Sequence, residues 1–188
     1  KFDHACGEAK VSVNCLDFAD LEHYALIRLT DQASPEDKLV PSQTALALRR
    51  KYKHIAVDEY QDINPVQQAI LDALSGGDNL FVVGDVKQSI YSWRGAEPGI
   101  FLDRLDEPAD AGASFRVDLN ANFRSQSGIL EFVNKIFRRI MTESFANIDY
   151  DESAELKSGL VKESAPHEPL VEFHILDEKS KDDADTPE

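Results

Sequence analysis

The chain has 188 residues, of which 42% are hydrophobic and 29% charged, enough for one ordinary domain or parts of two with a core of their own. No apolar run approaches the roughly 18–20 residues that cross a bilayer, and the first residues form neither a signal nor a transit peptide. Two cysteines and scattered histidines exclude a disulfide framework and a zinc site. We therefore expect a reduced, cytoplasmic protein. Because the chain does not begin with Met, we also expect it to be a fragment.

The net charge of −15 argues, taken alone, against a nucleic-acid-binding surface. The charge is uneven, however, because the part from residue 143 onward carries 14 acidic and 4 basic residues. We predict that the acidic tail, residues 177–188, is disordered. The short basic run at residues 49–53 is interpreted as a solvated helix end.

The first half of the chain carries the signals of helices and then of a parallel sheet. Helices are predicted over 16–29, with Phe18, Leu21, Ala25 and Leu29 on one face, and over 44–52. A loop at 34–37 separates them. The apolar runs 54–57 and 80–83 are typical of buried parallel strands, and a helix capped by Asn64 and Pro65 and ended by Gly76 and Gly77 lies between them.

This order of strand, helix and strand predicts an α/β fold, a parallel sheet with flanking helices. Ligands of such sheets gather beyond the carboxyl ends of the strands, where Asp58, Glu59 and Asp85 are placed. Further along, residues 109–114 are small and polar and could form a hinge between domains.

The second half of the chain is predicted to contain two more strands and one helix. The strands are expected over 115–119 and 169–176. The helix is expected to be capped by Ser127, with Ile129, Val133, Ile136, Phe137 and Ile140 at helical spacing.

Two adjacent carboxylates follow the first strand. One of the pair, Asp58, could hold Mg²⁺ directly or through water, because this ion prefers oxygen ligands. The other, Glu59, could orient or deprotonate an attacking water. An acidic turn after a core strand is the alternative, and an isolated Asp-Glu pair favours it.

The segment 84–96 joins several unusual residue types after the second strand. Gln88 could sense a phosphate, Tyr91 and Trp93 could stack on bases, and Arg94 could meet a phosphate or a base face. The alternative is that both aromatic residues belong to the core. In the segment 119–125, the cation of Arg124 could reach a phosphate on a neighbouring domain or form a surface salt bridge.

Together these segments resemble the UvrD/Rep superfamily of DNA helicases. Residues 58–62 resemble its motif II, residues 84–96 its motif III and residues 119–125 its motif IV, in family order. The segment 16–22 resembles the helix before motif II. Residues 86–88 and 148–152 resemble AddA-type subunits of helicase-nucleases, and the whole resemblance covers roughly residues 11–176.

The resemblance implies a role for each matching position. Asp58 would bind the Mg²⁺ of Mg-ATP, Glu59 would be the catalytic base, and Gln88 would read the γ-phosphate. Phe123, which stands where many relatives have Tyr, would pack on the adenine, and Arg124 would be the arginine finger. Within motif III, Tyr91 and Trp93 would stack on the bases of single-stranded DNA, with Arg94 beside them.

The phosphate-binding loop of such motors is missing, since no glycine of the chain is followed by lysine. We therefore expect RecA-like pieces: residues 1–112 as the end of the first motor domain, 113–176 as the start of the second, and 177–188 as a tail. The isolated chain should be inactive as an ATP hydrolase and bind single-stranded DNA weakly.

The expected function is that of a piece of an ATP-dependent DNA helicase acting in DNA repair or recombination. Its partners would be single-stranded DNA and a nuclease subunit or domain, and no membrane. Two alternatives stay open. The chain could be a non-catalytic binding or regulatory module with a degenerate helicase fold, or its carboxylates could form a metal-dependent nuclease or phosphatase site.

Overall fold

A computed structural model describes residues 2–35, 38–106, 115–142, 144, 150–152, 154–160 and 171–175, but not the side chains of residues 2–4. The chain divides into two compact units, Lys1–Arg116 and Val117–Glu188. Their assignment to two motor domains, with a boundary after residue 112, stays a prediction because residues 107–114 lie outside the described residues. No helix among the described residues is long and apolar enough to span a membrane.

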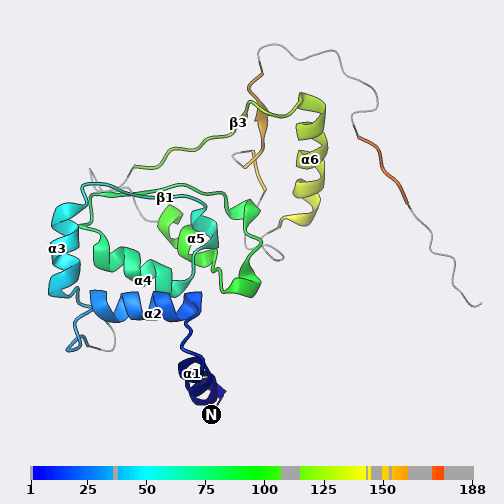
Figure 1. Cartoon of the computed structure of the whole chain (residues 1–188). Coiled ribbons are helices and arrows are strands. Elements are labelled where there is room, and N and C mark those ends of the chain that lie inside the picture. The colour runs from blue at the N-terminus through cyan, green and yellow to red at the C-terminus, as the bar shows by residue number, and fades with distance from the viewer. Residues whose placement is uncertain are drawn as a thin grey trace, which may run out of the picture. The chain divides into compact units, whose positions relative to one another are not determined.

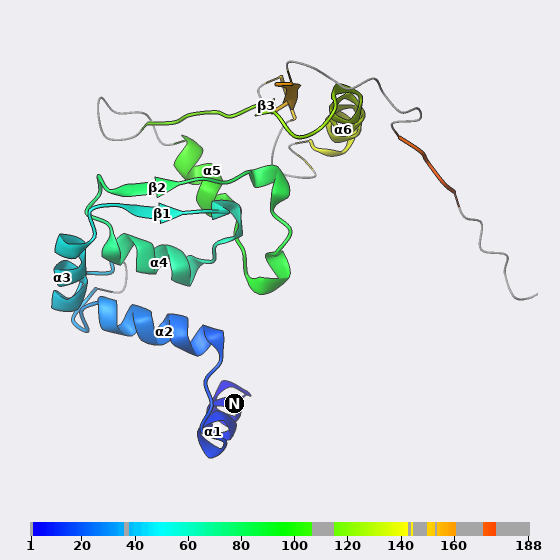
Figure 2. The same ribbon diagram turned by 45° about the horizontal axis from the view of Figure 1, so that its top comes forward.

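The first unit places two parallel strands on a layer of helices (Figures 1 and 2). Strand β1 pairs with β2 in the register Ile55 to Leu80, Ala56 to Phe81 and Val57 to Val82. The predicted α/β class with a parallel sheet is thereby confirmed. In chain order the elements are α1 (Phe2–Ser12), α2 (Phe18–Leu29), α3 (Gln43–Lys51), β1 (Ile55–Val57), η1 (Tyr60–Asp62), α4 (Pro65–Leu74), β2 (Leu80–Val82), η2 (Val86–Gln88), η3 (Ser92–Arg94) and α5 (Gly99–Asp106).

The helices of this unit begin where the sequence offers a side-chain cap. Asn64 accepts a hydrogen bond from the backbone of Gln67, whose side chain in turn accepts from the backbone of Asn64, and Pro65 fills the first helical position of α4. Asp17 and Asp20 form the same reciprocal cap at the start of α2. Such caps stabilise a helix by about 1 kcal/mol each.

The core of the first unit has two parts. Between α2, α3 and α4 lie the buried side chains of Leu29, Ala45 and Ala73. Next to the sheet lie those of Tyr60, Ile63 and Phe101, and Val57, Val82 and Leu71 pack against them. Figure 2 shows α4 between the strands and α2, which gives the unit its order of layers.

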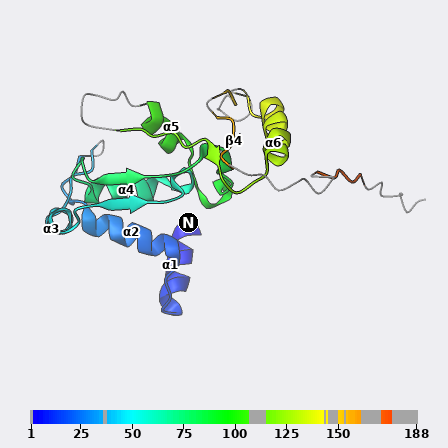
Figure 3. The ribbon, with the colours of Figure 1, turned by 90° about the horizontal axis from the view of Figure 1, so that it is seen from above.

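The opposite face of the two strands is uncovered among the described residues of the first unit. Ala56 and Phe81 point to this face, and Phe81 is 65% exposed. In Figure 3 the strands are seen from this side with α4 behind them. The prediction that the two strands are buried is therefore wrong for the described part of the chain, where each strand has an exposed central residue.

The second unit is built around α6 (Ser127–Ile140) and a small parallel pair, β3 (Ala121–Asn122) with β4 (Lys157–Ser158). Its central contact is polar. The buried side chain of Asn134 accepts from the Tyr150 hydroxyl at 2.7 Å and from the Leu156 backbone N–H at 3.2 Å. It also donates to the Leu156 carbonyl at 3.0 Å. This amide thereby fixes the segment that leads into β4 on the side of the helix.

Several predictions for this half of the chain are wrong. Residues 115–119 form no strand, since their backbone pairs with no strand among the described residues. Their apolar side chains lie exposed. Residues 171–175 form none either, and the rest of that predicted strand lies outside the described ranges. The cap position of α6 is Gln126 rather than Ser127, and it makes no side-chain cap bond. The predicted hinge and acidic tail lie outside the described residues.

Candidate active site

The end of β1 presents two exposed carboxylates on a turn with unusual backbone geometry. Glu59 lies in the left-handed region at φ 51° and ψ 45°, and Asp58 Oδ1 accepts its backbone N–H at 2.9 Å. The left-handed region is uncommon for residues other than glycine and costs of the order of 1–3 kcal/mol. Tyr60 holds the turn in place, since its backbone N–H donates to the Val83 carbonyl at 2.9 Å.

Tyr60 anchors this turn to the core beneath it. Its side chain is fully buried, its hydroxyl donates to Gln68 on α4, and its ring meets Phe101 of α5 edge to face at 5.5 Å. Arg104 lies over the ring at 5.5 Å. Burial raises the pKa of the Tyr60 hydroxyl, which therefore stays protonated. Because the anchor is rigid, the adjacent carboxylates project from a fixed backbone.

The end of β2 carries a third carboxylate, which is half-buried and paired. Asp85 accepts from the Lys87 ammonium at 2.8 Å, from the Lys87 backbone at 3.1 Å and from Gln88 Nε2 at 3.0 Å. Burial alone would raise the pKa of Asp85, but these hydrogen bonds outweigh it and hold the pKa below its ordinary value. Gln88, the predicted phosphate sensor, is thus oriented by Asp85.

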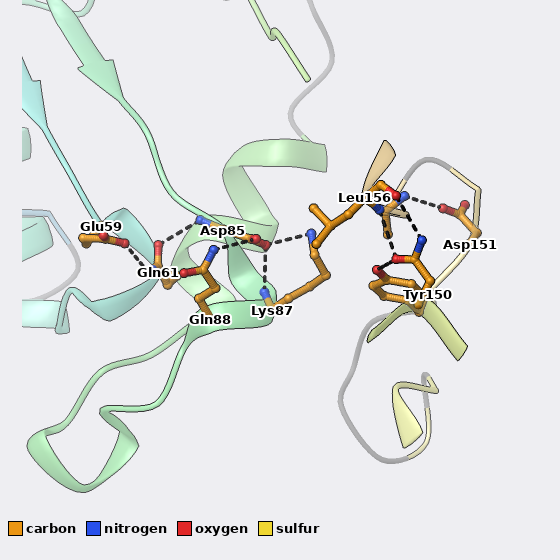
Figure 4. Close-up of polar contacts among 10 residues, drawn as sticks. Glu59, Gln61, Asp85, Lys87, Gln88, Tyr150, Asp151 and Leu156 are labelled. Atoms are coloured by element: carbon orange, nitrogen blue, oxygen red, sulfur yellow. Dashed lines mark hydrogen bonds and ion pairs between the residues drawn. The ribbon is translucent and has the colours of Figure 1, made fainter. Parts of the chain in front are cut away.

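A buried glutamine joins the two strand ends (Figure 4). Gln61 donates from Nε2 to Glu59 Oε2 at 2.7 Å, and its Oε1 accepts the Asp85 backbone N–H at 2.9 Å. Gly84 makes room for it, because a Cβ there would lie 2.5 Å from Gln61 Oε1. We predicted no role for either residue. The only signal in the sequence is that Gln61 lies two residues after Glu59 and Gly84 directly before Asp85.

The loop after η2 exposes an aromatic cluster with a cation between its rings. The guanidinium carbon of Arg94 lies 4.8 Å from the Trp93 ring centre and 5.8 Å from that of Tyr91. Trp93 is 73% exposed. The alternative that these aromatic side chains belong to the core is therefore wrong.

The remaining predicted site residues lie in the second unit. The side chain of Asn122 accepts the backbone N–H groups of Arg124 at 2.9 Å and Ser125 at 2.8 Å, a turn that leaves the side chains of Phe123 and Arg124 exposed. The Phe123 ring packs closely on Gly159, where an added Cβ would meet the ring at 2.5 Å. Backbone pairing of β3 with β4 holds this ring in place.

The structure thus brings together the residues of the two strand ends, and it gathers Tyr91, Trp93 and Arg94 in one cluster of the same unit. Phe123 and Arg124 are placed in the other unit. Among the described residues, no group of three or more His, Cys, Asp or Glu side chains is arranged to hold a metal ion.

Comparison with known proteins identifies the family. The model of the UvrD/REP helicase N-terminal domain matches residues 1–108. A protein from Desulforudis audaxviator, named as the A subunit of an ATP-dependent helicase/nuclease, is 47% identical over 183 residues, covering 93% of this chain and 15% of that protein. The protein of the same name from Oceanobacillus iheyensis is 41% identical over 187 residues, covering 97% of this chain and 15% of its own length.

A third relative of the same name, from Moorella thermoacetica, is 42% identical over 187 residues, covering 95% of this chain and 13% of that protein. The chain therefore spans about one seventh of the length of these relatives. Both parts of the resemblance, to UvrD/Rep helicases and to AddA-type subunits, are confirmed. Since the family model matches more than half of the residues of this chain, the chain belongs to the UvrD/Rep helicase family.

Proposed function

We propose that, in the full-length protein, this chain forms part of a motor that hydrolyses ATP to move along single-stranded DNA. The observation that carries the proposal is the connection between two kinds of site in one unit. The Glu59 carboxylate at the end of β1 is hydrogen-bonded through Gln61 to the loop after β2, and the same loop continues into the exposed aromatic cluster. A nucleotide site and a base-stacking site are thus joined through one hydrogen-bonded loop.

The nucleotide site consists of the exposed pair Asp58 and Glu59. A Mg²⁺ ion bound with a nucleotide keeps several waters and needs only one or two protein carboxylates, so Asp58 fits this role without a larger ligand cluster. The Mg²⁺ held by Asp58 would neutralise negative charge on the phosphates of the nucleotide. Glu59 would accept a proton from the attacking water, and Gln88 would contact the γ-phosphate.

The DNA site consists of Tyr91, Trp93 and Arg94. Exposed aromatic faces suit single-stranded DNA because every base has a π-face, and each stacked base is worth roughly 1–3 kcal/mol. The cation between the rings can also meet the phosphate backbone.

The second unit carries the other two residues of the proposed ATP chemistry. Phe123 packs on Gly159 yet is 71% exposed, so a purine can stack on its open surface. Arg124 would serve as the arginine finger that stabilises charge on the transferred phosphoryl group. Since the relatives are named helicase/nuclease subunits, a nuclease partner or domain and a role in DNA repair or recombination are part of the proposal.

The proposal is tested by measuring ATP hydrolysis of the full-length protein with and without single-stranded DNA. Replacing Glu59 with Gln keeps the shape of the side chain and removes the base, so we expect the DNA-stimulated kcat to fall roughly 100- to 10,000-fold. The control is Glu97→Gln, an exposed glutamate of the same unit outside the network. An active Glu59→Gln enzyme would refute the assignment, and a wild-type protein without ATP hydrolysis would favour a non-catalytic module.

A further inference from the structure

The side chain of Gln61 is the most deeply buried polar group of the first unit that touches the proposed site. It is 1% exposed, and both ends of its amide are bonded. A backbone N–H can only donate, so the Asp85 N–H must face the amide oxygen of Gln61. The amide nitrogen must then face Glu59. The orientation of the amide is therefore dictated by the chain itself.

Further contacts tie Gln61 to its surroundings. Its amide nitrogen also lies 3.4 Å from Asp62 Oδ2, a longer contact than the one to Glu59. Gly84 lies against the amide oxygen of Gln61 so closely that any Cβ would collide with it. The backbone carbonyl of Gln61 also accepts from the Ser89 hydroxyl at 3.2 Å, which ties the main chain of the turn to the same loop. Gln61 is thus bonded to the loop after β2 at two points, through its side chain and its backbone.

The side chain of Glu59, in contrast, is exposed and flexible by nature. An exposed glutamate samples several rotamers, and a charge-assisted hydrogen bond from a fixed donor selects one of them. Orientation matters for a group that must meet a water molecule, since a displacement of about 1 Å can lower a rate by roughly 100-fold. The donor is in turn fixed by the backbone of Asp85, so the carboxylate is positioned relative to that loop.

We propose that Gln61 is a positioning residue, which holds the Glu59 carboxylate in its reactive orientation from the backbone of the loop after β2. This inference rests on the proposed function, because it assumes that Glu59 is the catalytic base. Gln61 itself contacts neither nucleotide nor water in this role. Its effect on the reaction passes entirely through Glu59.

The test is a double-mutant cycle on the full-length protein, with kcat and KM for ATP measured in saturating single-stranded DNA. Gln61→Met keeps the volume and removes the side-chain hydrogen bonds to Glu59, to Asp62 and to the Asp85 N–H. We expect kcat to fall roughly 10- to 100-fold with KM changed less than about 2-fold. In the Glu59→Gln background, the same substitution should change the residual single-turnover rate by less than about 2-fold, because its target is gone.

Gln67→Met is the matched control, since this half-buried glutamine also bonds to a glutamate, Glu22 at 2.8 Å, away from the site. It should leave kcat within about 2-fold of wild type. Should Gln61→Met fail to fold, Gln61→Glu carries the test, because it retains the acceptor for the Asp85 N–H and, once ionised, loses the donor to Glu59. Its deficit in kcat relative to wild type should therefore grow as the pH rises through the pKa of the new carboxyl. It too should lower kcat with KM preserved.

The outcomes separate the two proposals. An active Glu59→Gln enzyme removes the proposed base and the inference with it. An inactive Glu59→Gln enzyme combined with wild-type kcat in the Gln61 variants overturns the positioning role alone. An equal loss from Gln61→Met in both backgrounds would also overturn it, because a merely structural contribution adds independently of Glu59.

Discussion

The two units of the chain are stabilised in different ways. In the first, apolar side chains from α2, α3, α4 and α5 form continuous clusters beneath a parallel strand pair. In the second, the segment that leads into β4 is attached to α6 by the buried amide of Asn134. The stacking of Phe137 on Tyr150 and the ion pair of Arg138 with Glu155 support the same attachment. The proposed site residues are also divided unevenly between the two units. The first unit carries a connected network, whereas the second presents Phe123 and Arg124 on a single turn.

The division of chemistry is tested most severely at Arg124. We expect Arg124→Ala to lower the DNA-stimulated kcat of the full-length protein by roughly 1,000-fold, because a finger stabilises charge that develops only in the transition state. Binding of ATP should change far less, which equilibrium titration with a fluorescent nucleotide can measure. Arg139→Ala, an exposed arginine of α6, is the control and should behave as wild type. An unchanged kcat in Arg124→Ala would indicate that the first unit alone supplies the catalytic residues of this chain.

The difference in stabilisation is tested at Asn134. Replacement by Leu keeps the size but removes the hydrogen bonds of Asn134 to the Tyr150 hydroxyl and to both backbone groups of Leu156, at a cost of about 3 kcal/mol. Hydrogen exchange followed by mass spectrometry should show faster exchange in α6 and β4, while β1 and β2 keep their protection. Lys135→Ala, an exposed neighbour, should change neither. Faster exchange in the strands of the first unit would show that the units are not separately stabilised.

The aromatic cluster of the first unit is tested by DNA binding. Trp93→Ala should weaken binding of a labelled oligonucleotide by about 1–3 kcal/mol, which corresponds to roughly 5- to 150-fold in Kd. Fluorescence anisotropy of the full-length protein at a fixed salt concentration measures it. Tyr52→Ala, a half-exposed aromatic residue at the end of α3, is the matched control. Equal affinities for wild type and Trp93→Ala would exclude this cluster from the DNA site.

The smallest expected effect concerns the charge at the end of β2. The folded pKa of Asp85 lies below the ordinary value of 3.8, so its ion pair contributes stability above about pH 4 and loses it as the pH falls through the folded pKa. Asp85→Asn should therefore have a lower Tm than wild type near pH 6, with the difference vanishing in acid. Asp78→Asn, an exposed aspartate before β2, serves as control. A difference that persists below pH 3 would contradict this origin.

Local signals in the sequence predicted the first unit well. Asn64 and Pro65 mark the start of α4, and the apolar runs before Asp58 and Asp85 become the two parallel strands. Each of these signals is contained within a few neighbouring residues. For the same reason, the carboxyl ends of the strands could be identified from the sequence alone as the place of the candidate site.

What depends on distant partners could not be predicted. The stretch 115–119 alternates like a strand, yet a strand needs a neighbour, and none is present among the described residues. Helix α5 begins at Gly99, directly after Pro98, although both residue types usually break helices, and it forms because Phe101 is buried against Tyr60. The bond from Gln61 to the backbone of Asp85 spans 24 positions, and nothing local indicates it.

The left-handed backbone at Glu59 has a consequence for protein engineering. Glycine would adopt this conformation without strain, and Asn or Asp would tolerate it better than other residues. A selection for thermal stability at position 59 would therefore enrich glycine and discard the carboxylate, whereas a selection for turnover would retain glutamate if it is the proposed catalytic base. The two selections would then favour different residues at this position, and a consensus drawn from stability screens alone would lose the proposed base.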